Sequence, residues 1–189
     1  MIEQMTSRAE SELIWAERAA TELLSPLEAR WRHTLRVVDR AQSFRNVLDR
    51  DELEVLLAAA YLHDVGYAPD LAEVGFHPLD GARFVREAGH ERLAGLVAHH
   101  SASDAEAMER GFTEELAEFP TEDSLVARAL TYCDLTTGPN GEEVGVSARL
   151  LELGGRLGED DPTVRAVRRE ASRLAAVVDE MESLLAAGR

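Results

Sequence analysis

The stretch AAYLHDVGY, residues 59–67, ends a run of eight apolar residues, Val55 to Leu62, with a histidine beside an aspartate. The run does not alternate as a half-buried strand would; acidic residues around Asp51 precede it and Gly66 follows it, which is typical of a buried helix. His63 and Asp64 are therefore expected at the end of a buried helix. Burying an imidazole and a carboxylate there is costly unless a partner compensates them.

The rest of the chain also has the patterns of helices. SRAE at residues 7–10 predicts a capping box, in which Ser7 caps the helix from Ser7 to Leu24 and Glu10 reaches back. Further helices are expected at 26–44, 51–66, 78–88, 91–100, 124–131 and 146–157, with longer loops at 66–77, 101–112 and 135–145. No segment alternates as a strand does. The predicted fold class is all-α, a compact single-domain helical bundle over residues 1–189.

A final helix is expected to begin at Asp161 and Pro162. Its apolar residues follow a three-four spacing: Val164, Val167, Ala171, Leu174, Val178, Met181 and Leu185. Such a seam suits a helix that packs on its own domain, and it also suits a homodimer contact. We expect the helices of residues 146–187 either to pack on the metal-binding core or to form a homodimer contact.

Composition narrows the classes of function. A chain of 189 residues with 45% hydrophobic content predicts one domain with a real core. The net charge of −16 argues against a nucleic-acid polymer as partner, because such proteins carry a basic face. All twenty basic residues are arginine, which excludes a Walker-type phosphate loop and a Schiff-base lysine.

The expected location is the cytoplasm. No apolar stretch approaches the roughly 20 residues that a membrane-spanning helix needs, and the amino end lacks the pattern of a secretory signal. The single cysteine, Cys133, cannot form an internal disulfide, which fits a reducing compartment. We therefore expect a small ligand or a metal as partner, and no membrane.

The histidines carry most of the functional information. Five of the six lie at or near the ends of apolar helical segments, as does one aspartate: His33, His63, His77, His99, His100 and Asp134. Imidazole and carboxylate are the donors that borderline divalent cations prefer. Adjacent side chains on a helix diverge by about 100°, so His63 and Asp64 can reach one ion, or Asp64 can bridge two. The pair is predicted to be a pair of metal ligands.

The ordered set of His33, then His63 and Asp64 thirty residues later, then Asp134 resembles the HD superfamily of metal-dependent phosphohydrolases. HPLDGARFV at 77–85 and VAHH at 97–100 resemble members that hold two or more ions, including the cyclic-dinucleotide phosphodiesterases of the HD-GYP group. The chain departs from that group: Tyr67 replaces a lysine, Ala29 replaces an acid, and SASDAEAMERGF replaces the GYP loop. The resemblance implies a metal-binding core at about residues 26–135.

The resemblance also implies a ligand set for two divalent ions, such as iron, manganese or magnesium. One ion would be held by His33, His63, Asp64 and Asp134. A second would be held by His77, His99 and His100, with Asp64 shared and catalytic. The implied reaction is hydrolysis of a phosphate ester, in a nucleotide or another small phosphorylated metabolite, by metal-activated water.

The charge of such a substrate would be met by arginines. Arg36, one turn beyond His33, is the predicted catalytic and substrate-binding arginine, since it lies on nearly the same helical face. Arg83, after His77, is a second candidate. Tyr67 and Thr137 are further predicted substrate contacts, the latter in a turn-rich loop after Asp134. An arginine chosen in this way is more often a member of a surface ion pair, and that alternative stays open for both.

Two other functions stay open. A di-iron oxygenase resembling this superfamily would use the same six ligands, namely His33, His63, Asp64, His77, His99 and Asp134. A non-catalytic sensing module is the other alternative. It is disfavoured because erosion of activity shows first as missing ligands, and the set is complete.

Overall fold

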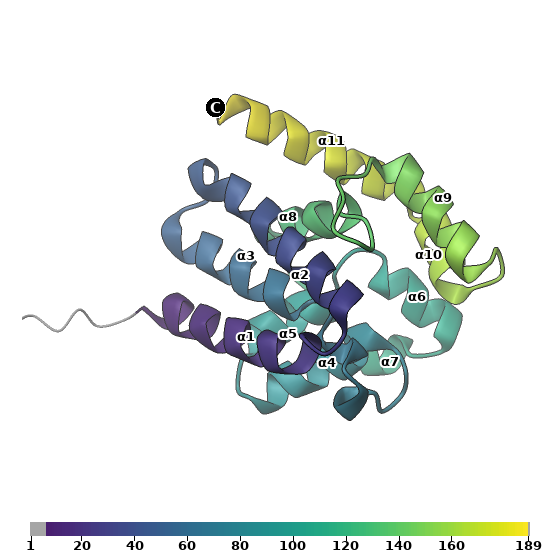
Figure 1. The fold of residues 1–189 in the computed structure, drawn as a ribbon, viewed down its shortest axis with the longest axis horizontal. Helices are drawn as coiled ribbons and strands as arrows, with labels where there is room; N and C mark the ends of the chain where they lie inside the picture. Colours follow the sequence, from purple (N-terminus) through teal and green to yellow (C-terminus); the bar gives the residue numbers. More distant parts are fainter. Residues whose placement is uncertain (1–6, 189) are drawn as a thin grey trace, which may run out of the picture.

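The computed structural model describes residues 7–188, which fold into helices (Figure 1). The first five α-helices are α1 (Arg8–Leu24), α2 (Glu28–Ala41), α3 (Arg50–Leu62), α4 (His77–Glu87) and α5 (Glu91–Ala98). The next are α6 (Ser103–Arg110), α7 (Thr113–Leu116), α8 (Leu125–Leu135), α9 (Val146–Leu157), α10 (Pro162–Arg169) and α11 (Ala171–Ala187). Three 3₁₀ turns are η1 (Gln42–Asn46), η2 (Val65–Tyr67) and η3 (Pro69–Leu71). Within residues 7–188 the only strand-like pairing is one bridge, Thr137 to Glu143, so the all-α prediction is confirmed.

Side-chain caps start several of these helices by accepting a first-turn N–H, at Ser7, Asp49, Ser124 and Asp161. The Ser7 cap is as predicted, because its Oγ accepts from the Glu10 N–H at 3.0 Å. The Glu10 carboxylate instead lies 3.4 Å from Arg50 of α3. The predicted capping box is therefore replaced in its second half by an ion pair that joins α1 to α3.

Helix α3 lies at the centre of the main hydrophobic cluster, with α1, α2, α5 and α8 packed around it. Residues 54–60 and Leu62 are all buried, so nearly every face of the helix meets a neighbour. This position explains why the apolar run before His63 is continuous rather than periodic. It also places the end of the run in the interior of the protein.

A second hydrophobic cluster lies between α6, α9, α10 and the start of α11, on the opposite side of the molecule from α1 (Figure 1). Its buried members are Ala102, Ala105, Leu135, Leu153, Val164, Ala166, Val167 and Leu174. Helix α11 then continues to the main cluster, where Val178 and Met181 are buried. The seam predicted for one final helix therefore packs inside the chain, divided between the two clusters.

Two predictions of local structure were wrong. The segment 101–112 contains helix α6 rather than a loop, and this helix packs on α10. The helix is short and its apolar residues are mainly alanines among charged residues, so by composition the segment resembles a loop. The final helix is broken at Glu170, which ends α10 and begins α11, although the apolar spacing runs across the break without interruption.

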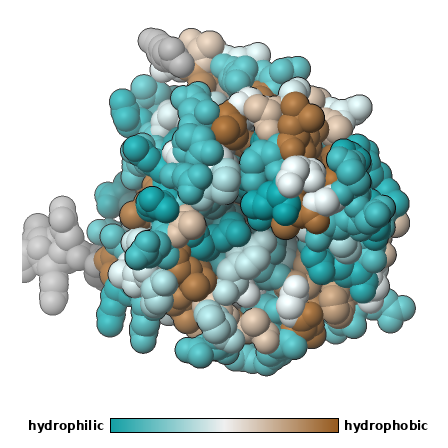
Figure 2. Space-filling model, turned by 45° about the vertical axis from the view of Figure 1, so that its right-hand side comes forward, coloured by the Kyte–Doolittle hydropathy of each residue, from teal (hydrophilic) through white to brown (hydrophobic). Residues whose placement is uncertain are grey.

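The surface is mainly hydrophilic on the face seen in Figure 2, and its hydrophobic residues form small separate patches. Among residues 7–188, no helix has the length and apolar character needed to cross a bilayer. The expectation that the amino end lacks a secretory signal falls partly on residues 1–6, outside the described residues. Cys133 is fully buried in the main cluster, and burial raises the pKa of its thiol.

Candidate metal centre

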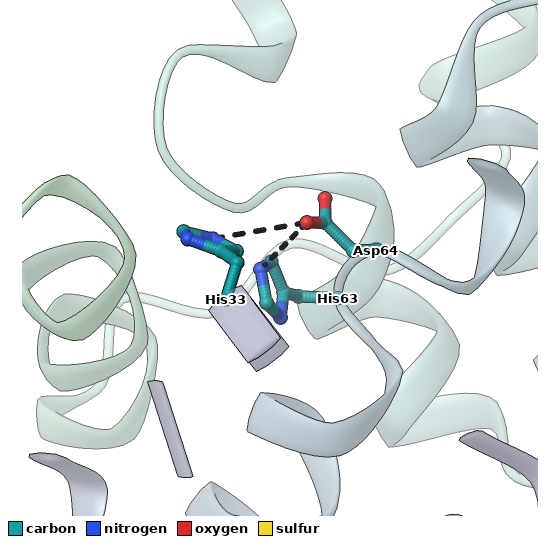
Figure 3. Close-up of side chains that lie close together, drawn as sticks. All are labelled: His33, His63 and Asp64. Carbon is teal, nitrogen blue, oxygen red and sulfur yellow. Dashed lines mark ion pairs between the residues drawn. The ribbon is translucent and has the colours of Figure 1, made fainter. Parts of the chain in front are cut away.

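The end of α3 turns His63 and Asp64 into the interior, where they are 0% and 3% exposed. The His63 N–H still bonds to Ala59 O, whereas Asp64 has left the helix. His33 comes from the neighbouring helix α2. Figure 3 shows His33 and His63 directed at the same oxygen of Asp64, with Nε2 to Oδ2 distances of 3.7 and 3.3 Å.

Asp134 joins this group from α8. Its Oδ1 lies 3.2 Å from His33 Nε2 and 3.9 Å from His63 Nε2. Its other oxygen accepts a hydrogen bond of 2.5 Å from Ser101 Oγ. Ser101 has a φ of 56°, and its backbone is held by Thr131, which accepts from its N–H. Ser101 is a contact that the sequence analysis missed.

A second group of donors shares Asp64. His77 Nε2 lies 3.5 Å from Asp64 Oδ1, and His100 completes a triad whose three donor atoms lie within 4.8 Å of one another. His33, His63 and Asp64 form the other triad by the same measure. Asp64 thus directs one oxygen to each group, which is the arrangement that a bridging carboxylate requires.

Gly66 allows His77 to come this close to Asp64. A Cβ on Gly66 would lie 2.0 Å from the carbonyl oxygen of His77 and 2.6 Å from the N–H nitrogen of Gly81. The turn after Asp64 therefore packs backbone to backbone against the first turn of α4. Asp80 closes the intervening loop by accepting from the N–H groups of residues 74 and 75 at 3.1 and 3.0 Å.

Three imidazoles are oriented by backbone carbonyls. The Nδ1 atoms of His33, His63 and His100 lie 3.0, 2.8 and 2.7 Å from the carbonyl oxygens of residues 138, 60 and 97. Each contact requires a proton on Nδ1, which leaves the lone pair on Nε2 facing the cluster. Metal-binding histidines are commonly held by a second contact of this kind.

The buried carboxylates of the cluster are stabilised by nearby positive charge. His63 Nε2 is buried without a well-oriented hydrogen-bond partner among the described residues. Burial alone would lower the pKa of His63, but the Asp64 carboxylate overrides it and raises the pKa to about 9. Burial opposes ionisation of Asp64, yet Arg30 and then His63 hold its pKa well below its usual range. A proton on His63 is one source of positive charge here. A divalent cation is another, and the imidazole and carboxylate donors fit it.

Arg30 contacts the cluster directly and was not predicted. Its Nη1 donates to Asp64 Oδ2 at 2.7 Å, and its guanidinium lies 4.0 Å from the centre of the Tyr67 ring. Tyr67 stacks in turn on His77, with ring centres 4.1 Å apart. Arg30 lies three residues before His33 and Arg36 three residues after it, so the two arginines flank His33 on opposite sides, each about 60° from it around the helix. The spacing of three residues from His33 was the signal in the sequence for an arginine near the cluster, and both arginines have it.

His99 does not join either triad, contrary to the prediction. Its Nδ1 lies 2.8 Å from Asp104 Oδ1 and its Nε2 lies 3.2 Å from the carbonyl oxygen of Phe119, so both ring nitrogens are engaged. Helix α5 ends at Ala98, and the following turn directs neighbouring side chains to different sides. Of the two adjacent histidines, His100 lies in the cluster and His99 does not.

Three predicted substrate contacts also lie away from the cluster. Arg36 is exposed and lies 3.4 Å from Asp39, because Asp64 meets α2 on the other side of His33. Arg83 pairs with Glu73 at 3.4 Å. The Thr137 hydroxyl donates to the Cys133 carbonyl oxygen at 2.7 Å, and Thr137 lines a surface hollow together with Arg36. Of the predicted substrate contacts, Tyr67 is the one at the cluster.

Comparison with known proteins gives one match. A family model described as HD domain matches residues 30–137, more than half of the chain. The chain belongs to the HD-domain family. This family implies the superfamily of metal-dependent phosphohydrolases, whose HD domains bind divalent metals, although some members are non-catalytic. No curated protein and no solved structure matches the chain.

A cavity of about 260 Å³ opens beside the cluster of the HD domain. Its near end is lined by Arg30, Asp64, Tyr67, His77, His100 and Asp134. Its opposite end is formed by α6, α9 and α10, whose lining residues include Arg110, Arg149, Leu153, Arg156, Leu157 and Val167. Helices α9 and α10 lie beyond the family match, so this cavity is completed by parts of the chain that the match does not cover.

Proposed function

We propose that the protein is a metal-dependent phosphohydrolase that cleaves a phosphate ester of a small metabolite, such as a nucleotide. The observation that carries the proposal is the pair of donor triads that share Asp64 at one end of an arginine-lined cavity. A bound divalent cation supplies Lewis acidity toward a phosphoryl oxygen and a water molecule acidic enough to attack at neutral pH.

The proposed ligands of the first ion are His33, His63, Asp64 and Asp134. Those of the second are Asp64, His77 and His100; His99, which was expected to bind beside His100, is left out of the set. Four imidazoles favour iron or another transition metal over magnesium, while the carboxylates are also compatible with manganese. Two ions of iron or manganese are therefore the proposed cofactors.

Arg30 takes the role expected of Arg36. Its hydrogen bond to Asp64 Oδ2 holds that carboxylate in place, and its guanidinium also lines the cavity. A guanidinium with further donors can bind a phosphoryl oxygen and stabilise the charge that develops on it. Tyr67 lies between Arg30 and His77, in contact with both, and so limits the movement of either.

The di-iron oxygenase is the second candidate, since the six proposed donors would also serve it once His100 replaces His99. The arginines of the cavity favour an anionic substrate such as a phosphate ester, and an oxygenase would use them only for an organic substrate that is also anionic. A purely sensing module is less well supported, because the donor set is complete.

Phosphate release provides the test. Protein reconstituted with Mn²⁺ or Fe²⁺ is incubated with nucleotides, dinucleoside polyphosphates and small phosphomonoesters, and inorganic phosphate is measured. We expect release from at least one class, and none from Asp64→Asn. No release from any substrate, together with an azide-sensitive near-ultraviolet band in the iron-loaded protein, would replace the proposal with the oxygenase.

A further inference from the structure

The end of the cavity opposite the metal cluster has its own charged groups. We call it the far wall and define it by Arg149, Leu153, Arg156 and Leu157 of α9 with Arg110 of α6. All but Arg110 lie beyond residue 137, where the HD-domain match ends. The far wall is therefore a feature of this chain rather than of the matched domain.

Arg149 is buried, with only 8% of its surface exposed, yet it lines the cavity. Its Nη1 donates to Glu152 Oε2 at 2.7 Å. Its remaining side-chain donors have no hydrogen-bond partner among the described residues. These donors are accessible to solvent on the cavity side, so an anionic group in the cavity would bind them in place of water.

Arg156 shares the same carboxylate. Its Nε donates to Glu152 Oε1 at 2.6 Å, so Glu152 serves two guanidinium groups and one positive charge stays uncompensated. Arg110 differs, because Glu106 neutralises it at 2.7 Å. Asp161 also lines the cavity, but its carboxylate caps α10, whose dipole offsets part of its charge. In a chain with a net charge of −16, the excess of positive charge on α9 is local.

We propose that the substrate carries a second anionic group, a phosphate or a carboxylate, and that Arg149 and Arg156 bind it. The inference rests on the proposed function, which assigns the phosphate ester to the metal cluster. The substrate class is then a small metabolite with an anionic group at each end, whose carbon skeleton contacts Leu153 and Leu157. Arg149 and Arg156 are specificity-determining residues, because they lie away from the reacting phosphate.

Phosphonates test the proposed second anion site, because they bind like phosphate esters but are not hydrolysed. The Mn²⁺-loaded protein is titrated in a calorimeter with α,ω-alkyldiphosphonates and with alkylphosphonates of the same chain lengths. At the best length, the diphosphonate should bind about tenfold more tightly, as expected for one or two charge-assisted hydrogen bonds. An alkylphosphonate that binds as tightly as its diphosphonate would overturn the inference, since the far wall would then recognise the apolar chain.

Substitutions on α9 test which residues cause the tighter binding of the diphosphonate. Arg156→Met and Arg149→Met should each remove most of the advantage of the diphosphonate and leave the affinity for the alkylphosphonate unchanged. Glu152→Gln should increase the advantage, because it removes the negative charge that both guanidinium groups share. The matched control is Arg165→Met on α10, because Arg156 and Arg165 have equally exposed side chains, at 44%, and Arg165 pairs with Glu109. An equal loss of affinity for both ligands, or an unchanged advantage in all variants, would overturn the inference.

The two proposals can fail separately. Protein that hydrolyses p-nitrophenyl phosphate but does not distinguish the two phosphonates retains the proposed function and loses this inference. Protein that distinguishes the phosphonates through Arg149 and Arg156 but hydrolyses no phosphate ester loses the proposed function and retains the second anion site.

Discussion

The two ends of the cavity are stabilised in different ways. At the metal cluster, His33, His63 and His100 are fixed by backbone carbonyls, which can move only if a helix or a loop moves. At the far wall, the side chain of Glu152 on the same helix is the one hydrogen-bond partner that Arg149 and Arg156 have within residues 7–188. The comparison indicates a rigid site for chemistry that faces an adjustable site for recognition. Substitutions at the first should abolish function, whereas those at the second should change only selectivity.

The largest expected effect comes from Asp64, which both triads share. Asp64→Ala should lose nearly all bound metal and all phosphate-ester hydrolysis, because each ion loses a ligand and the two positive sites lose their common counter-charge. Elemental analysis at equal protein concentrations measures the bound metal, and phosphate release measures the hydrolysis. Asp104→Ala, which removes an exposed aspartate bound to His99, should keep its metal. Full metal retention by the Asp64 variant would remove this residue from the ligand set.

Adjacent histidines allow the boundary of the cluster to be tested at single-residue resolution. His100→Ala should lose about one equivalent of metal, because His100 belongs to one triad only. His77→Ala should behave in the same way. His99→Ala should keep the full complement, because both of its ring nitrogens are bound elsewhere. Loss of metal from the His99 variant would contradict the geometry described for this segment.

A third comparison concerns two arginines of α2. Arg30→Met should lower the rate of hydrolysis by roughly a hundredfold, the usual effect of deleting one electrostatic group aimed at developing charge. Arg36→Met should leave the rate unchanged, because Arg36 is exposed and pairs with Asp39. Steady-state kinetics are measured together with metal content. An Arg30 variant with full metal and full rate would mean that another arginine serves the phosphate.

The same substitution in the two regions should have opposite effects on stability. Gly66→Ala places a Cβ 2.0 Å from the His77 carbonyl oxygen and should lower the free energy of unfolding by about 2 kcal/mol, as overpacking does. Gly155 lies inside α9, and apart from its own stretch of helix no atom lies within 4 Å of its Cβ position. Gly155→Ala should raise the free energy of unfolding by about 0.5 to 1 kcal/mol.

Urea unfolding of the metal-free variants, followed by circular dichroism, measures both changes. Equal effects of the two substitutions would show that the backbone contact of Gly66 with α4 is not maintained in solution.

The fold could be predicted where burial is complete or a cap is present. The continuous apolar run of α3 and the Ser7 cap both lead to helices that the structure contains. Helix α6 was missed because it is short and its segment is strongly polar, with alanines as most of its apolar residues. The break at Glu170 was missed because the apolar spacing on either side is in register, while the two halves pack against different clusters.

At the candidate site, the types of donor could be predicted but not their directions. His99 and His100 are adjacent, and the place where α5 ends decides which one faces inward. Arg30 and Arg36 are equally spaced from His33, and the position at which α3 meets α2 decides between them. The far wall could not be predicted, because Arg149 and Arg156 reach the cavity only through the packing of α9.

The buried thiol beside Asp134 gives this protein an internal reporter of its own motion. Cys133 is the only cysteine in the sequence and is fully buried in α8, so a thiol-directed reagent can label it only when the core opens. The labelling rate under native conditions therefore measures the free energy of that opening without any introduced probe. A cation that links Asp134 to α2 and α3 should slow the labelling, so one chemical reaction would report both metal occupancy and the cooperativity of the core.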